Sequence, residues 1–241
     1  MTNAGNILIT GGTDGIGLRL AQQYSSRGAN VVVSGRRPIA AAKDLLPANV
    51  HYIKADQSEP EKAALNIIDG LEKIGWQHCD LAILNAGNGT VCLPLEEKAD
   101  SLLNTLDVNL SAPIVITHAL APLLFKASNE KLTIIGSTSH KGAANFASYA
   151  ASKAGLNGFA RSLREEWKGR VNVQIIHPGP TATAMHAKAG FEPGVIKHIF
   201  LDPDFVTRTI IRKIDNGGSP VSISFLARFL DHITLRSLVS R

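Results

Sequence analysis

Short apolar runs rich in β-branched residues recur along the chain and alternate with stretches of helical spacing. The runs cover residues 6–10, 31–34, 50–54, 81–84, 132–136 and 171–177. Strands that alternate with helices predict parallel βαβ units, whose crossover helices cover both faces of a sheet. We therefore expect an α/β fold: a single-domain, doubly wound (Rossmann-type) parallel sheet over residues 1–241, with helices on both faces.

Apolar residues at helical spacing predict the crossover helices. A helix over 15–27 places its apolar residues on one stripe. Longer helices are expected over 102–126 and over 146–168, the first of them broken near Pro113 and Pro122 because proline cannot continue the helical hydrogen bonds.

Two segments toward the C-terminus follow a different pattern. Glycine and proline punctuate residues 178–203, which we interpret as a loop with short helical pieces and a substrate-loop segment at 184–202. An amphipathic helix is expected at about 225–239, where one stripe holds Leu226, Phe229, Leu230 and Ile233, away from Arg228 and Arg236. Packing of that stripe on the domain or on a partner subunit is favoured over a position on a membrane surface.

Composition limits the class of protein. With 44% hydrophobic and 19% charged residues, the 241-residue chain has enough apolar material for a core, which excludes disordered, collagen-like and coiled-coil proteins. No apolar run approaches the roughly 18 residues of a membrane span, and no basic segment opens the sequence as in exported proteins. Cys79 and Cys92 form neither a disulfide framework nor a metal-ligand pattern with histidines. We therefore expect a cytoplasmic protein without a metal.

The net charge of +5 is concentrated near the C-terminus. Residues 205–241 hold six Lys or Arg against two acids, which leaves +1 for residues 1–204. A nucleic-acid-binding surface usually forms a basic stripe with interleaved aromatic residues, and aromatic residues make up only 5% of this chain. We therefore expect no nucleic-acid partner.

A glycine-rich segment, TGGTDGIG, lies between the first predicted strand and the first predicted helix, the context that a dinucleotide-binding loop requires. Gly11 permits the tight turn, Gly15 lets the backbone approach a pyrophosphate, and Gly17 allows close packing of the helix. Free N–H groups at the helix start attract the anion. Alone, the pattern also fits a plain glycine-rich turn. The candidate cofactor contacts here are Gly11, Thr13, Asp14, Gly15, Ile16 and Gly17.

The end of the second strand bears on the choice of cofactor. Arg36 and Arg37 stand where an NAD site usually has an acid for the ribose 2′-hydroxyl, whereas arginine accommodates a 2′-phosphate. NADP(H) is therefore favoured over NAD(H). Two observations weigh against this choice, because the arginines can simply solvate a helix start and because Asp14 would repel a phosphate.

The spacing TGxxxGxG resembles that of the short-chain dehydrogenase/reductase family, and the resemblance covers nearly the whole chain. It implies a sheet in the order 3-2-1-4-5-6-7, with residues 221–224 as the last strand. Further matches follow the third and fourth strands and lie in the next helix: Asp56 at the adenine ring, the motif Asn85-Ala86-Gly87 (with Leu84 where the family has Asn), and the tetrad asparagine, Asn109.

Tyr149 and Lys153 lie four positions apart in a predicted helix, so both side chains share one face. The lysine cation and an oxidised nicotinamide would both lower the tyrosine pKa from its usual value of about 10. Ser137, twelve residues before Tyr149, matches the serine of the family. The resemblance implies that Tyr149 protonates the alkoxide, Ser137 holds its oxygen and Lys153 grips the nicotinamide ribose. It also implies a water at Asn109 for proton resupply.

Two neighbours of Ser137 offer alternatives. Ser139 carries a second hydroxyl, although spacing and the strand-end position favour Ser137. His140 next to a serine is also found in hydrolases, but the chain has no GxSxG elbow and no acid placed to orient this histidine. We therefore place His140 at the rim of the pocket. His177 and His186 show no metal-ligand spacing.

Pro178, Gly179, Thr181 and Thr183 follow the sixth strand and match the PG motif of the family, which holds the nicotinamide carboxamide. Thr181 stands where an aliphatic residue is more usual. The resemblance implies transfer of the pro-S hydride. The alternative is a Pro-Gly turn that merely ends the strand.

These residues together predict an oxidoreductase that transfers a hydride between NADP(H) and a carbonyl or secondary alcohol. A small lipophilic ketone or 3-oxoacyl-type substrate is favoured by the apolar residues Met185, Phe191, Ile196, Ile199 and Phe200. One alternative is an NADPH-binding regulatory or sensor protein with little turnover, which would be expected to lack a tetrad residue. Another is a membrane-associated lipid reductase. We expect a homodimer or homotetramer without membrane association, although the C-terminal segment departs from the usual Gly-Gly ending of the family.

Overall fold

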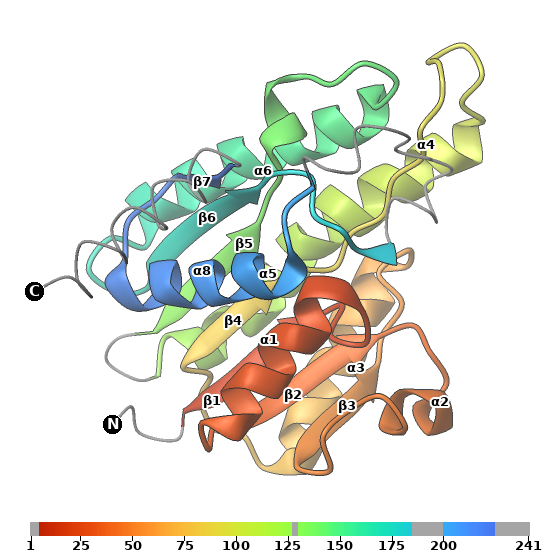
Figure 1. Ribbon diagram of the computed structural model, residues 1–241. Helices are drawn as coiled ribbons and strands as arrows, with labels where there is room; N and C mark the ends of the chain where they lie inside the picture. Colours follow the sequence, from red (N-terminus) through yellow and green to blue (C-terminus); the bar gives the residue numbers. More distant parts are fainter. Residues whose placement is uncertain (1–4, 127–129, 185–199, 225–241) are drawn as a thin grey trace, which may run out of the picture.

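The computed structural model describes residues 5–126, 130–184 and 200–224. Their strands form one parallel sheet in the order β3-β2-β1-β4-β5-β6-β7 (Figure 1). Strands β2 and β3 are added to one side of β1, and the chain then crosses to the other side of β1 to add β4 to β7. This architecture confirms the predicted fold class and strand order. The strands are β1 Asn6–Thr10, β2 Asn30–Gly35, β3 Val50–Lys54, β4 Leu81–Leu84, β5 Lys131–Ile135, β6 Asn172–Pro178 and β7 Val221–Ile223.

Helices cover both faces of the sheet (Figure 1). One face carries α1 Gly15–Ser26 and α8 Pro203–Asn216, and the other carries α3 Pro60–Ile74, α5 Ala112–Leu124 and α6 Ala147–Glu166. Two shorter helices are α2 Ile39–Lys43 and α4 Ala99–Leu106. Because successive side chains of a strand point to opposite faces, each strand contributes to two cores.

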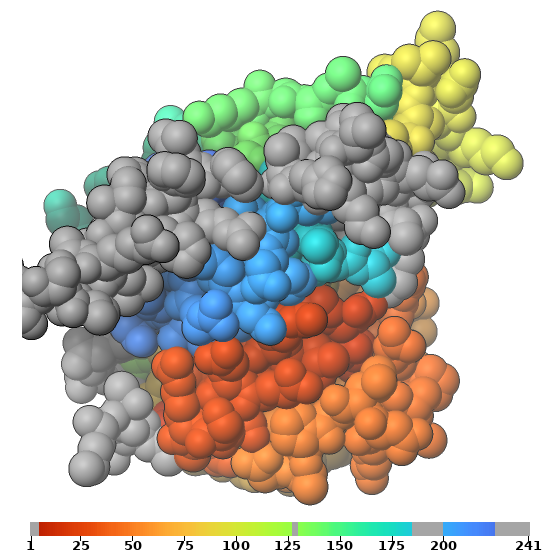
Figure 2. Space-filling view, viewed as in Figure 1, coloured from red at the N-terminus to blue at the C-terminus, as the bar shows by residue number. Residues whose placement is uncertain are grey.

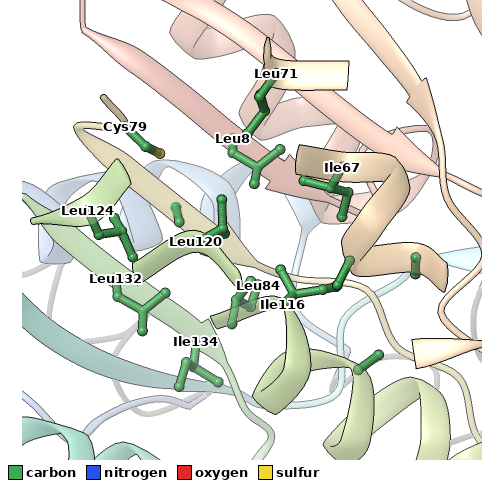
Figure 3. Close-up of a cluster of buried hydrophobic side chains, with 14 of the residues drawn as sticks. Leu8, Ile67, Leu71, Cys79, Leu84, Ile116, Leu120, Leu124, Leu132 and Ile134 are labelled. Atoms are coloured by element: carbon green, nitrogen blue, oxygen red, sulfur yellow. The ribbon is translucent and has the colours of Figure 1, made fainter. Parts of the chain in front are cut away.

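Strand β1 shows the two cores at once. Leu8 packs under α3 and α5, where a tight cluster joins the two helices to the sheet (Figure 3). Ile7 and Ile9 point the other way, toward α1 and α8. These two helices lie side by side on the surface in Figure 2, and Arg19 of α1 forms a 2.8 Å ion pair with Asp204 of α8.

Capping residues set the ends of these helices. The Asp14 carboxylate accepts a hydrogen bond from the Gly15 amide and starts α1. The α3 helix ends at Gly75, which adopts a left-handed φ of 86°. The α8 helix, absent from the sequence-based prediction, begins with the same chemistry: Asp202 caps the Phe205 amide, and Pro203 takes the first helical position.

The prediction that the helix over 102–126 is broken near Pro113 and Pro122 is wrong. The helix runs without interruption from Ala99 to Leu124 and contains a π-helical turn, Asp107–Ser111. Pro113 has no amide hydrogen, so the Asn109 carbonyl lacks the donor four residues later that an α-helix would supply, and the wider turn accommodates this loss. Pro122 lies inside α5, close to its end, without breaking it.

The segment Ala99–Leu124 is also long and apolar enough to cross a membrane, judged by length and composition alone. In this fold α5 is a core helix, because Ile116, Leu120 and Leu124 are fully buried against the sheet and α3. Two predicted features, most of the substrate-loop segment 184–202 and the amphipathic helix at 225–239, lie outside the described residues. They include Met185, Phe191, Ile196 and Ile199.

Candidate active site

The candidate residues gather at one edge of the sheet. Each group follows the carboxyl end of a parallel strand, and these ends meet around the point where the strand order reverses, which is where open α/β sheets bind ligands. The loop after β1 holds residues 11–17, β2 leads to Arg36 and Arg37, β3 to Asp56, β4 to residues 85–87, β5 to Ser137, and β6 to residues 178–183.

The glycine loop is held against the segment after β4. The Thr10 hydroxyl accepts hydrogen bonds from the Asn85 and Ala86 amides at 3.0 and 3.1 Å. The Asn85 side chain donates to the carbonyls of Thr10 and Gly11. A Cβ on Gly17 would collide with the Gly11 carbonyl oxygen, so this close approach requires glycine. The loop and the NAG motif therefore form one rigid unit.

The PG segment closes on the same loop. A Cβ on Gly15 would lie 3.4 Å from the Thr183 methyl group, so the two segments approach each other closely. The Thr181 hydroxyl donates to the Gly179 carbonyl at 2.9 Å, and Gly179 itself donates to the carbonyl of Ile223 on β7. Backbone pairing thus fixes the start of the segment at the sheet edge.

Asn109 joins the π-helical turn to the catalytic helix. Its amide group donates to the Asn88 carbonyl and its side-chain oxygen accepts from the Asn88 amide, both at 2.8 Å. The same NH₂ donates to the Ser152 hydroxyl at 3.1 Å. The side chain thereby positions the backbone at Asn88 and is linked to Ser152 of α6.

Tyr149, Ser137 and Lys153 meet at the floor of the site. The Tyr149 hydroxyl is hydrogen-bonded to the Ser137 side chain. The Lys153 ammonium lies 5.7 Å from the centre of the tyrosine ring and donates to the Ile135 carbonyl at 3.1 Å. A Cβ on Gly87 would lie 3.5 Å from the lysine nitrogen and 3.3 Å from the Asn109 side-chain oxygen. All four predicted catalytic side chains are therefore brought together.

Comparison with known proteins agrees with this geometry. The family model described as short chain dehydrogenase matches residues 5–192. The chain belongs to the short-chain dehydrogenase family. The Escherichia coli K12 uncharacterized oxidoreductase YciK is 31% identical over 195 residues, which cover 76% of each chain. The 3-oxoacyl-acyl-carrier-protein reductase FabG of the same organism is 30% identical over 184 residues, which cover 74% of each chain.

Solved short-chain dehydrogenases share both the fold and the cofactor. A Shigella flexneri protein complexed with NADP has a TM-score of 0.76 at 27% identity, covering 88% of this chain and 91% of its own. An Escherichia coli CFT073 protein complexed with NADPH has a TM-score of 0.74 at 28% identity, with coverage of 88% and 90%. This short-chain dehydrogenase is an NADP(H)-dependent oxidoreductase.

The residues after β2 fit a phosphorylated ribose. Arg36 is exposed and has no ion pair or hydrogen bond within the described part of the chain. Arg37 instead lies 3.9 Å from the Asp14 carboxylate, which already caps α1. The expected repulsion between Asp14 and a phosphate is therefore offset by a neighbouring cation and a helix start. Asp56 accepts hydrogen bonds from the Ser58 amide and hydroxyl at the start of α3.

Burial shifts the pKa values of Tyr149 and Lys153 in opposite directions. Burial raises the pKa of Tyr149, an effect that the hydrogen bond from Ser137 partly offsets. Burial also lowers the pKa of Lys153 to about 8. Desolvation therefore dominates the tyrosine pKa in the protein without cofactor, and the expected lowering by the lysine and an oxidised nicotinamide stays a prediction for the complex. Tyr149 is neutral at pH 7 and carries a proton that it can donate.

The structure separates Ser137 from its neighbours. The Ser137 hydroxyl faces Tyr149, whereas Ser139 contributes its backbone amide, which donates to the Ser137 side-chain oxygen at 3.1 Å. His140 lies behind the serine, with its Nδ1 2.7 Å from the Ser137 carbonyl oxygen. Ser137 is thus the serine whose side chain contacts Tyr149, and His140 supports its backbone.

Sequence reasoning missed three residues that shape the site. His177 is buried, stacks on His140 with ring centres 4.0 Å apart, and places its Nδ1 3.2 Å from the same Ser137 carbonyl. Gly89 must be small, because a Cβ there would lie 2.8 Å from the Tyr149 ring. The Ser152 hydroxyl links Asn109 to the Tyr149 carbonyl. The glycine after Asn88 was a readable signal, but the other two contacts depend on tertiary packing.

The described residues contain no group of three His, Cys, Asp or Glu side chains that could bind a metal ion. Cys79 is buried, and burial raises its thiol pKa to about 12. This thiol is therefore a core residue rather than a nucleophile.

Proposed function

We propose that this dehydrogenase reduces a small lipophilic ketone or a 3-oxoacyl-type carbonyl to a secondary alcohol. The observation that carries the proposal is the hydrogen bond between the Tyr149 and Ser137 hydroxyls, with the Lys153 ammonium beside them. Two hydroxyls that converge on one point offer two donors to a single carbonyl oxygen. The 3-oxoacyl activity in the name of the FabG relative supports this substrate class.

The reaction uses the chain's own groups for binding and proton transfer. NADPH, when bound, supplies the hydride that adds to the carbonyl carbon. Ser137 donates a hydrogen bond to the carbonyl oxygen, and Tyr149 transfers its hydroxyl proton to that oxygen as the negative charge develops. The tyrosinate left behind is stabilised by the Lys153 cation. A water at Asn109 returns a proton to this site.

The cofactor contacts are proposed from position. The glycine loop, residues 11–17, faces the pyrophosphate, and Arg36 faces the 2′-phosphate. Asp56 and the NAG motif contact the adenosine half. The nicotinamide is held by Pro178, Gly179, Thr181 and Thr183. We further propose a cytoplasmic homodimer or homotetramer that has no nucleic-acid or membrane partner.

The first experiment follows NADPH oxidation by absorbance with a panel of 3-oxoacyl thioesters, cyclic ketones, diketones and keto-sugars. We expect turnover with an apolar ketone or a thioester. Turnover confined to keto-sugars would contradict the substrate class. Tight NADPH binding without turnover on any carbonyl would instead favour the regulatory or sensor protein.

Tyr149→Phe tests the mechanism. Loss of one hydroxyl removes the proton donor, so kcat is expected to fall by about 10²–10⁴-fold while NADPH binding is nearly unchanged. Tyr24→Phe is the matched control, because the Tyr24 hydroxyl is buried in the α1 core without a hydrogen-bond partner in the described structure. Equal turnover in Tyr149→Phe and the wild type would contradict the proposed role.

A further inference from the structure

The turn that carries the two arginines is held from the neighbouring strand. Tyr52 lies on β3, and its hydroxyl is 2.6 Å from the Gly35 carbonyl oxygen and 2.8 Å from the Arg37 carbonyl oxygen. These two carbonyls flank Arg36, so one side chain bonds the turn on both sides of that residue. A phenol has one proton to donate, which the two acceptors share. Burial raises the pKa of Tyr52, so the hydroxyl remains a donor at neutral pH.

The glycine loop reaches the same point from the other side. A Cβ on Gly35 would lie 3.3 Å from the Thr13 hydroxyl and 3.4 Å from the Tyr52 hydroxyl, so the three residues meet with no spare room. The Gly12 amide donates to the Ser34 carbonyl at 3.2 Å. The end of β2 therefore lies between the phosphate-binding loop and the tyrosine hydroxyl.

Arg36 depends on this support because its own side chain has none. The guanidinium group is exposed, and within residues 5–126, 130–184 and 200–224 it has no ion pair or hydrogen bond. A long cation on a mobile turn loses conformational entropy when it binds an anion, and this loss weakens binding. A backbone that is already fixed before binding reduces this loss of conformational entropy. Orientation of Arg36 must therefore come through its backbone, which Tyr52 holds.

We propose that Tyr52 is a positioning residue for the discrimination between NADPH and NADH. Its hydroxyl fixes the turn that presents Arg36 to the 2′-phosphate. The inference rests on the proposed contact between Arg36 and that phosphate. NADH has no 2′-phosphate, so loss of the Tyr52 hydroxyl weakens the binding of NADPH and spares that of NADH.

The test measures dissociation constants for NADPH and NADH by calorimetry or nucleotide fluorescence, so it needs no substrate. Tyr52→Phe is expected to raise the NADPH dissociation constant by about three- to tenfold, the effect of one lost hydrogen bond, and the NADH constant by less than about twofold. Tyr24→Phe removes an equivalent hydroxyl from the α1 core and is expected to change neither constant. An equal loss for both nucleotides in Tyr52→Phe, or no loss for NADPH, would overturn the inference.

A double-mutant cycle checks that Tyr52 acts through Arg36. Once Arg36→Ala has removed the guanidinium, adding Tyr52→Phe is expected to cause no further loss of NADPH affinity. Additive losses would overturn the proposed route. Wild-type NADPH affinity in Arg36→Ala would overturn both the phosphate contact and this inference, while leaving the proposed carbonyl chemistry at Tyr149 untouched.

Discussion

At the scale of single residues, burial of Lys153 and of His177 makes the stability of the protein depend on pH. Lys153 is 3% exposed, and the pKa of its ammonium group falls to about 8. At neutral pH the folded protein therefore holds a cation in a poorly solvated position. Such a charge costs free energy unless it is fully paired, and the proposed role of Lys153 in the reaction explains why the fold keeps it.

Lys153→Met is expected to stabilise the protein at pH 7 and to remove its turnover. Between pH 8 and 10.5 the unfolded chain keeps the lysine proton that the folded protein has released. The stability of the wild type therefore rises across this range and is reduced below it. The substitution is expected to raise the free energy of unfolding by about 1–3 kcal/mol at pH 7, and by progressively less as the pH approaches 10.5.

Denaturant unfolding of both proteins at pH 7 and pH 10 measures this gain. The exposed Lys73→Met is the control and is expected to change stability little at either pH. A Lys153→Met protein that is less stable than the wild type at pH 7 would contradict the argument.

His177 is expected to make the protein sensitive to acid. Burial lowers its pKa, and with the smaller electrostatic effects of His140, Lys153 and Lys141, partly offset by the hydrogen bond with the Ser137 backbone, the pKa falls from 6.5 to about 4. As the pH falls from 6.5 to 4, the unfolded chain takes up this proton before the folded protein does, so stability is lost, by up to about 3 kcal/mol. His177→Asn is expected to abolish this part of the pH dependence.

Urea unfolding of the wild type and His177→Asn between pH 7 and pH 4 gives the comparison. His118→Asn, at an exposed position of α5, is expected to follow the wild type. Parallel loss of stability in the wild type and His177→Asn would show that other groups cause the acid sensitivity.

At the scale of helices, two helical glycines differ in the space around them. Gly158 lies in the interior of α6, and a Cβ there would meet nothing within 4 Å, so Gly158→Ala is expected to stabilise the protein by about 0.5–1 kcal/mol. Gly17 lies in α1, where a Cβ would collide with the Gly11 carbonyl and approach the Asn85 amide to 2.5 Å. Gly17→Ala is expected to weaken NADPH binding about tenfold or more, because the loop must shift.

Calorimetric titration with NADPH and thermal unfolding of both variants measure these effects. The two substitutions add the same methyl group, so the difference between the variants reports the surroundings of each glycine. Wild-type NADPH affinity in Gly17→Ala would show that the loop tolerates the added methyl group.

Much of the element pattern is readable from local chemistry, and the exceptions have physical reasons. Strand alternation and helical stripes predict β1 to β6 and helices α1 and α6 within a few residues. The signal for α8 was present in Asp202 and Pro203, a cap followed by a first-turn proline. The π-helical turn was not readable, because proline near Asn109 is equally compatible with a break, and packing of α5 on the sheet decides for continuity.

At the scale of the whole molecule, exposed leucines on one helical segment point to association. Leu103 of α4 is 55% exposed, and Leu102 of α4 and Ile114 of α5 are also exposed. Burial of such residues against a second copy would stabilise an oligomer. We expect a homodimer or homotetramer in solution, and Leu103→Glu is expected to shift it toward monomer.

Size-exclusion chromatography with light scattering measures the mass of both proteins. Leu65→Glu is the matched control, because Leu65 is 65% exposed on α3, a different helix, and its substitution is expected to leave the mass unchanged. A wild-type protein that is monomeric at all concentrations would contradict the prediction.

Local spacing by itself determined the fold class, the glycine loop and the shared face of Tyr149 and Lys153, because strand alternation and the i, i+4 relation are properties of the elements themselves. Tertiary structure decided the rest. The contacts of Asn109 with Asn88 and of His177 with Ser137 join residues that only the strand order brings together. The pKa directions of the catalytic pair likewise follow from burial, which depends on all the elements packed around the site and not on any one motif.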